Sequence, residues 1–180
     1  TVDSFRDGYH WQQSFSLGDP NESLQQLEAT QETGTTVTFF ASPTIFETTT
    51  YSYETLATRF REMAFLNKGL KITIADRRTS AADEDDDADA DSQRQQTFQY
   101  KDGLIDYVKY LIGTKETINS TVIAIDAASP EQQMSLEVAM QWNTSFNESV
   151  HTFANTINTH EGGTHEEGFR AALTNTVNKW

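Results

Sequence analysis

The sequence of 180 residues predicts a mixed α+β fold. Several segments alternate apolar and polar residues, which is typical of half-buried strands. Other segments repeat apolar residues at intervals of three and four, as amphipathic helices do. Glycine-containing turns precede several of these segments, at Gly34, Gly69 and Gly162. Together the three observations favour strands and helices in one chain over an all-helical or all-strand protein.

In the first half of the chain we expect three strands. Residues 10–16 carry Trp11 and Phe15 at spaced positions, and residues 36–40 are rich in Thr, Val and Phe after a turn at Gly34. Residues 70–75 alternate Leu and Ile with polar side chains, as a half-buried strand does.

A helix is expected between the last two of these strands. Ser52 is a suitable N-cap, and Lys68-Gly69 is typical of a cationic last turn followed by a C′ glycine. Four apolar residues fall on one face of this helix: Leu56, Phe60, Met63 and Ala64.

The second half predicts a short strand at 97–100, a short helix at 103–111 and a buried strand at 122–125. Residues 134–142 alternate most regularly of all, and we expect them to pair with a strand at 150–157. We place a domain boundary near residues 102 and 103, which divides the chain into 1–102 and 103–180.

A last helix is expected after Gly162-Gly163, where Thr164 and Glu167 have the spacing of a capping box. Its apolar stripe runs to Trp180 without a C-cap, and the chain opens on Thr1 without an initiator Met or a signal peptide. We therefore expect this chain to be a piece of a longer protein, with an unfinished second domain.

Charge is concentrated in one segment. The net charge is −14, from 13 Lys and Arg against 27 Asp and Glu, and residues 83–91 contain seven of the acids. This imbalance argues against a phosphate-binding face and against a basic membrane patch. A calcium loop would carry a turn glycine, which this run lacks. We expect a disordered surface loop over about residues 80–95.

Deleting residues 83–91 is expected to leave the melting temperature of the chain nearly unchanged. A polyacidic loop has few buried contacts to lose, so the free energy of unfolding should change by no more than about 0.5 kcal/mol. Thermal melting of the two chains checks this, and a clear fall in melting temperature would show that the run binds something structural.

Candidate ligand sites are few. The chain has no cysteine and no apolar run long enough to cross a membrane. His160 and His165 are five residues apart with glycines between them, so a helical zinc site is disfavoured. The turn Gly162-Gly163-Thr164 could bind an anion, but Glu166 and Glu167 follow it, and a tight turn is the better interpretation. We expect no metal ligands and no catalytic residues.

Four stretches of the sequence indicate a protein family, which the composition alone does not. In order and spacing they resemble the DNA gyrase B family, the ATPase subunits of bacterial type II topoisomerases; topoisomerase IV is the near alternative. The stretches are residues 33–40, 53–69, 137–143 and 155–165 with 168–170. An alternative from another class is a non-catalytic acidic interaction module.

The resemblance implies a fold for each half. Residues 1–102 would be the C-terminal half of a GHKL-type α/β sandwich, and residues 103–180 the first half of a transducer domain of ribosomal-protein-like α+β fold. It also implies a cytoplasmic enzyme that binds ATP and Mg²⁺, dimerises on ATP binding, and acts on DNA together with the gyrase A protein, with no membrane partner.

One nucleotide contact carries over from the resemblance. The second Thr of the Thr-Gly-Thr motif would hydrogen-bond the adenine and its bound water, and here that residue is Thr35. Gly34 would let the backbone turn tightly before it. The general base, the metal ligand and the lysine for the γ-phosphate are expected outside this chain, so the fragment itself is expected to be inactive.

Overall fold

The computed structural model describes residues 1–78 and 94–180. The predicted acidic loop lies outside these residues, except that Arg94 and Gln95 already belong to a strand. The described chain forms two compact units, Thr1–Tyr51 and Ser52–Trp180, and each is considered by itself. The boundary near residues 102 and 103 concerns the domains of the family, and it stays a prediction.

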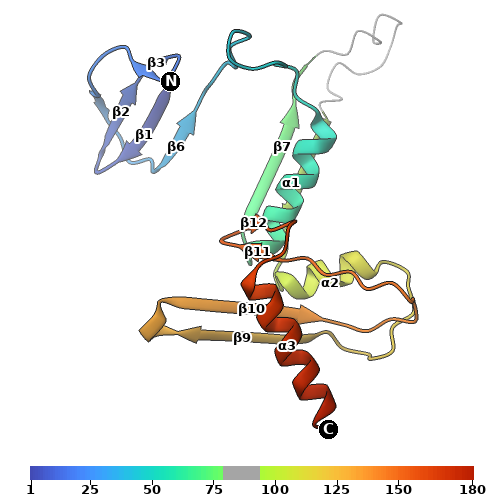
Figure 1. Cartoon of the computed structure of the whole chain (residues 1–180). Coiled ribbons are helices and arrows are strands. Elements are labelled where there is room, and N and C mark those ends of the chain that lie inside the picture. The colour runs from blue at the N-terminus through green and yellow to red at the C-terminus, as the bar shows by residue number, and fades with distance from the viewer. Residues whose placement is uncertain (79–93) are drawn as a thin grey trace, which may run out of the picture. The chain divides into compact units, whose positions relative to one another are not determined.

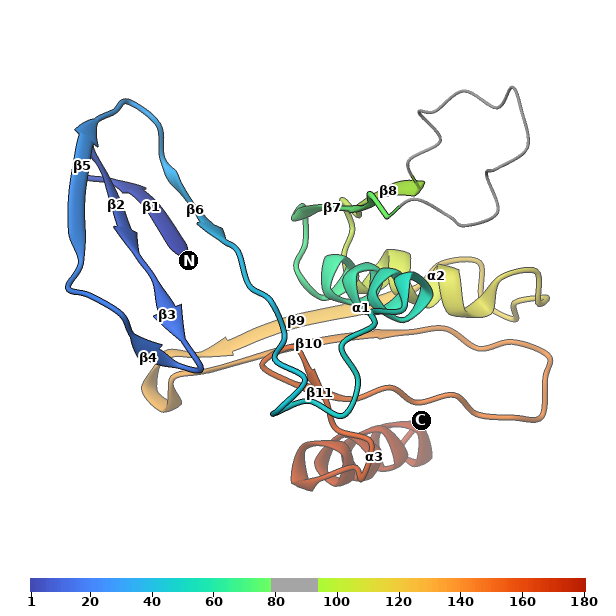
Figure 2. The same ribbon diagram turned by 90° about the horizontal axis from the view of Figure 1, so that it is seen from above.

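The first unit is built on a four-stranded antiparallel sheet with the strand order β5-β2-β1-β6, seen from above in Figure 2. The strands are β1 (Val2–Arg6), β2 (Tyr9–Gln13), β5 (Gln25–Ala29) and β6 (Gly34–Val37). A separate small hairpin joins β3 (Phe15–Ser16) to β4 (Asp19–Pro20).

A two-residue turn at Asp7-Gly8 connects β1 to β2, where Arg6 pairs with Tyr9. Both turn residues have positive φ, at 55° and 82°, which is the backbone that matches the twist of a tight hairpin. The expected strand at 10–16 is divided between β2 and β3, and the expected strand at 36–40 begins earlier and ends at Val37. Strands β1 and β5 were not predicted.

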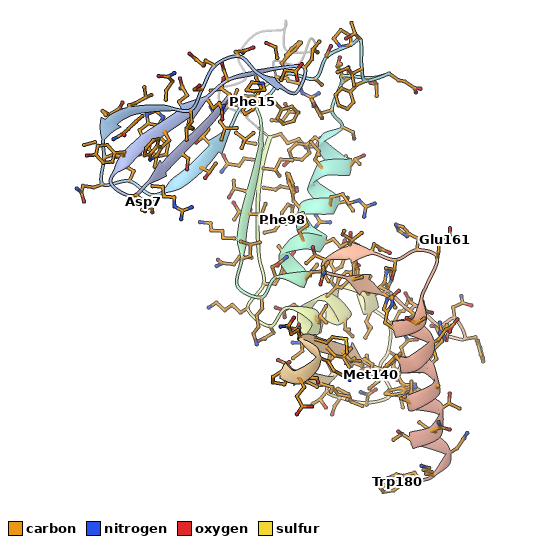
Figure 3. The ribbon with its side chains drawn as sticks, turned by 60° about the vertical axis from the view of Figure 1, so that its left-hand side comes forward. Asp7, Phe15, Phe98, Met140, Glu161 and Trp180 are labelled. Carbon is orange, nitrogen blue, oxygen red and sulfur yellow. The ribbon has the colours of Figure 1, made fainter. Side chains whose placement is uncertain are left out.

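The second unit begins with helix α1 (Tyr53–Leu66), which packs on the antiparallel hairpin of β7 (Lys71–Asp76) and β8 (Arg94–Gln99) (Figure 1). The predicted cap is confirmed, because the Thr55 amide donates to Ser52 Oγ at 3.3 Å. The helix and hairpin share an apolar core to which Phe98 contributes from β8 (Figure 3). Its buried members are Tyr53, Ala57, Ala64, Ile74 and Phe98.

Arg94 fastens the start of β8 to the first turn of α1. Its guanidinium lies 4.2 Å from the centroid of the Tyr53 ring, and it also pairs with the Glu54 carboxylate. Across the ladder of this hairpin, Arg94 lies opposite Asp76, the last residue of β7. The end of β7 and the start of β8 are therefore held together by contacts that involve α1, β7 and β8.

Phe65 joins α1 to the residues that follow β8. Its ring stacks on Tyr100 at 3.6 Å and on Tyr107 at 5.0 Å between centroids, and the tilted ring of Tyr110 lies at 5.4 Å. Tyr107 and Tyr110 belong to helix α2 (Leu104–Ile112), which the sequence predicted. Phe65 is only 1% exposed, and its contacts with the tyrosines of α2 pack the two helices together.

The rest of the unit contains two hairpins and a terminal helix. Strand β9 (Ile123–Ser129) pairs antiparallel with β10 (Met134–Met140) around a short 3-10 turn at Pro130–Gln132, where Gln133 is left-handed. Strand β11 (Phe153–Ala154) pairs with β12 (Ile157–Asn158). The predicted pairing of residues 134–142 with 150–157 is therefore wrong. Each of these segments pairs instead with a nearer strand across a short connection.

Helix α3 (Thr164–Asn178) begins one residue earlier than the predicted capping box requires. Gly163 is the N-cap, so Thr164 is already helical and caps nothing, and the predicted capping box is wrong. Glu166 instead accepts a hydrogen bond from Arg170 Nε at 2.8 Å, one turn further along. Trp180 lies fully exposed beyond the end of this helix (Figure 3).

Candidate functional site

The predicted nucleotide contact lies on β6, the edge strand of the first unit. Thr35 pairs with Ser4 and Gly34 with Phe5, both across the β1–β6 ladder. Gly34 has φ +144°, a backbone conformation that L-amino acids rarely adopt, although an added Cβ would meet open space. Glycine is therefore required here for its backbone conformation and not for close packing.

Successive side chains of a strand point to opposite faces, so Thr35 shares a face with Ser4 and Trp11. Thr36 points to the other face, with Asp3. Thr35 is exposed, and within residues 1–78 and 94–180 its hydroxyl makes no hydrogen bond. The structure thus presents an exposed hydroxyl on an edge strand, available to donate a hydrogen bond to a ligand.

A polar cluster that the sequence did not predict lies on the other face of the same sheet. His10 on β2 places Nε2 2.9 Å from Asp3 Oδ1 and Nδ1 3.2 Å from Glu28 Oε1. Gln12 Nε2 donates to the same Asp3 oxygen at 2.7 Å. The pKa of Asp3 is lowered by the Gln12 and His10 hydrogen bonds, and the pKa of His10 is raised by its bond to Asp3 and then by Glu28.

The second unit contains a polar cavity of about 560 Å³. Arg59 donates to Glu62 Oε2 at 3.0 Å, and Arg170 contacts both Glu148 and Glu166. The residues that line it are Arg59, Glu62, Glu148, Val150, His151, Thr152, Asn158, Thr159, His160, Glu166 and Arg170. Both arginines of this lining are paired with carboxylates, so the positive charges of the cavity are balanced by negative ones.

Tyr107 lies beside this cavity, with its hydroxyl 3.3 Å from Glu62 Oε1. Burial, and then the Glu62 carboxylate, raises the pKa of Tyr107 to about 12, so the phenol stays protonated and donates. In the part of the chain that the structure describes, no three metal-binding side chains come together. His165 Nε2 instead lies 3.1 Å from Thr159 Oγ1.

Comparison with known proteins identifies the family. The family model for DNA gyrase B matches residues 103–180. The DNA gyrase B protein of Streptomyces coelicolor is 54% identical over 180 residues, which is 97% of this chain and 26% of that protein. The chain belongs to the DNA gyrase B family. The gyrase B protein of Mycobacterium tuberculosis H37Rv is 46% identical, over 99% of this chain and 29% of its own length.

The fold comparison extends along almost the whole of this gyrase B chain. The 43K ATPase domain of Thermus thermophilus gyrase B, solved in complex with an aminocoumarin, superposes with a TM-score of 0.77 at 28% identity. That match covers 99% of this chain and 45% of the solved one. The predicted GHKL and transducer fold class is therefore confirmed, and so is the predicted resemblance. The chain spans about a quarter of the length of the curated relatives that it matches.

Gly34 and Thr35, the two site residues that the resemblance implies, are the first two residues of β6. The structure adds the cluster around His10, which sequence reasoning missed because its members lie on three separate strands. The Glu166–Arg170 pair has helical spacing and was visible in the sequence, but it was not singled out. Among the described helices, none is long and apolar enough to cross a membrane.

Proposed function

We propose that this chain is a segment of the ATPase subunit of a bacterial DNA gyrase. In the complete protein, ATP binding would close a dimeric clamp around DNA, and hydrolysis would reset it for the next strand passage. Coupling to the gyrase A protein would give negative supercoiling in the cytoplasm. The observation that supports this most directly is the position of Thr35, an exposed hydroxyl on an edge strand in a gyrase B fold.

The resemblance implies a role for each part of the chain. Residues 1–102 would supply the end of the ATPase domain and residues 103–180 the start of the transducer. Thr35, which follows the turn at Gly34, would hydrogen-bond the adenine of ATP. Most other ATP contacts, and those to Mg²⁺, would come from parts of the gyrase B protein outside these residues. The similar proteins are named gyrase, which favours gyrase over topoisomerase IV.

Replacing Thr35 by alanine in the complete gyrase B protein is expected to weaken ATP binding about fivefold. This corresponds to the loss of one hydrogen bond, worth about 1 kcal/mol. Thr35→Val keeps the shape of the side chain and should show a similar loss. Calorimetric titration with a non-hydrolysable ATP analogue measures the effect.

Thr36→Ala is the matched control, because the neighbouring threonine is on the same strand but faces the other way. The affinity of the Thr36→Ala protein for the analogue should stay near that of the unaltered protein. An unchanged affinity in Thr35→Ala would contradict the proposed role. An equal loss in Thr36→Ala would show that the strand, and not the hydroxyl, was disturbed.

A further inference from the structure

His10 links three neighbouring strands through one side chain. It stands on β2, which lies between β1 and β5 in the sheet. One ring nitrogen reaches Asp3 on β1 at 2.9 Å, and the other reaches Glu28 on β5 at 3.2 Å. Because β6 pairs with β1, the strand that carries Thr35 belongs to the same linked sheet.

Both bonds can form together only when the ring is charged. A neutral imidazole has one N–H and one acceptor nitrogen, and an ionised carboxylate can only accept. Gln12 already donates to Asp3 Oδ1 at 2.7 Å, which favours the ionised carboxylate. The Phe5 ring stacks on the imidazole with centroids 4.6 Å apart, and an aromatic face favours a cation over a neutral ring.

We propose that His10 is a protonation-dependent clamp, which holds β5 against β2 when the ring is charged and releases that contact when the ring loses its proton. The proposal is independent of the nucleotide-binding role of Thr35. It concerns how the sheet that carries this residue responds to pH.

The exposure of the partners decides which contact is lost first. The Asp3 side chain is 19% exposed and that of His10 is 13% exposed, whereas the Glu28 side chain is 71% exposed. A neutral ring would therefore keep its proton on Nε2, toward the sheltered Asp3. Its Nδ1 lone pair would then face the Glu28 carboxylate, and the contact between β2 and β5 would become repulsive.

The other charged groups of this sheet act on Asp3 or stay apart from the cluster. The amino group of Thr1 contributes to the lowered pKa of Asp3, and it donates to the Thr38 carbonyl oxygen at 2.9 Å. Arg6 and Asp7 at the hairpin end pair with each other in solvent. The carboxylates of Asp3 and Glu28 thus remain the charges that act directly on His10.

The pH window follows from the direction of each shift. The pKa of His10 is raised in the folded chain, so its stabilisation is complete below the unfolded value near 6.5 and is lost as pH rises through the folded pKa. The pKa of Asp3 is lowered mainly by Gln12, and that of Glu28 by its own backbone amide and then by His10. Their contributions are lost as pH falls, so the clamp is strongest between about pH 5 and 6.5.

NMR of the 180-residue chain tests the clamp directly. Ring nitrogen shifts should show a charged His10 at pH 6 and a neutral ring protonated on Nε2 at high pH, with a pKa above the ordinary value near 6.5. Amide hydrogen exchange, corrected for its intrinsic pH dependence, should show protection of β5 falling about two- to fivefold relative to β6 from pH 6 to 8.

Two variants separate the clamp from ordinary packing. Glu28→Gln should remove most of the pH-dependent difference in β5 protection and lower the pKa of His10. Glu32→Gln, which removes a carboxylate just beyond β5, should leave both unchanged. A neutral His10 ring at pH 6, or β5 protection that does not change with pH, would overturn the proposal. A Glu28→Gln chain that keeps the full pH dependence would also overturn it.

Discussion

Phe65→Ala is expected to lower the free energy of unfolding of the second unit by about 3–5 kcal/mol, which is the range for removing a buried aromatic ring. Phe65 is the largest side chain that is almost fully buried within the described residues. Three tyrosine rings surround it, so the cavity that alanine leaves cannot close without moving both α1 and α2. A loss of this size is a large part of the total stability of a small domain.

Urea denaturation followed by the circular dichroism of the helices measures this loss, because the described α-helices all belong to the second unit. Phe146→Ala is the matched control, because it removes the same ring from a fully exposed position of the same unit. Its effect should stay within about 0.5 kcal/mol. Equal midpoints for the two variants would contradict the assignment of Phe65 as the centre of the aromatic cluster.

The second large effect concerns turnover. The 180-residue chain alone is expected to release no phosphate from ATP above the uncatalysed background, whereas a complete gyrase B protein is expected to do so. ATP hydrolysis needs a positioned base for water, a metal held by side chains, and cations on the phosphates. In residues 1–78 and 94–180 no metal-binding group is assembled, and Arg59 and Arg170 are already engaged by carboxylates.

A phosphate-release assay with ATP and Mg²⁺ checks this expectation, with the gyrase B protein of Streptomyces coelicolor as a positive control. Titration of the chain with an ATP analogue should likewise show no micromolar binding, because one hydrogen bond from Thr35 supplies too little free energy. Measurable turnover by the isolated chain would contradict the proposed distribution of roles.

Local signals in the sequence predicted the helices well and the strands only in part. The hydroxyl of Ser52 and the apolar spacing that follows it specify α1, and these interactions act within one or two turns of the chain. The short helix at Leu104–Ile112 and the strand at Lys71–Asp76 were found for the same reason. The capping box failed because the helix α3 starts directly after two glycines, one residue before the position that the motif requires.

Pairing between strands was predicted less well, because it depends on residues far apart in sequence. Strand β10 alternates strongly, but alternation does not say which segment lies beside it. The cluster at His10 depends on the registers of three strands at once, so no spacing in the sequence indicates it. Thr35 was found only through the resemblance to a family, since the neighbouring residues in sequence are typical of any turn that leads into a strand.

The contacts of Arg94 bear on how much the length of the chain between β7 and β8 can change. Asp76 and Arg94 face each other in the ladder, and Arg94 is also held by Tyr53 and Glu54. Asp76 and Arg94, which flank the chain between β7 and β8, are thus held by contacts that do not depend on how many residues lie between them. Doubling the length of a flexible loop costs only about 0.6 kcal/mol in closure entropy. We therefore expect the chain between Asp76 and Arg94 to accept insertions, including a fluorescent reporter domain, while α1 and the β7–β8 hairpin keep their geometry.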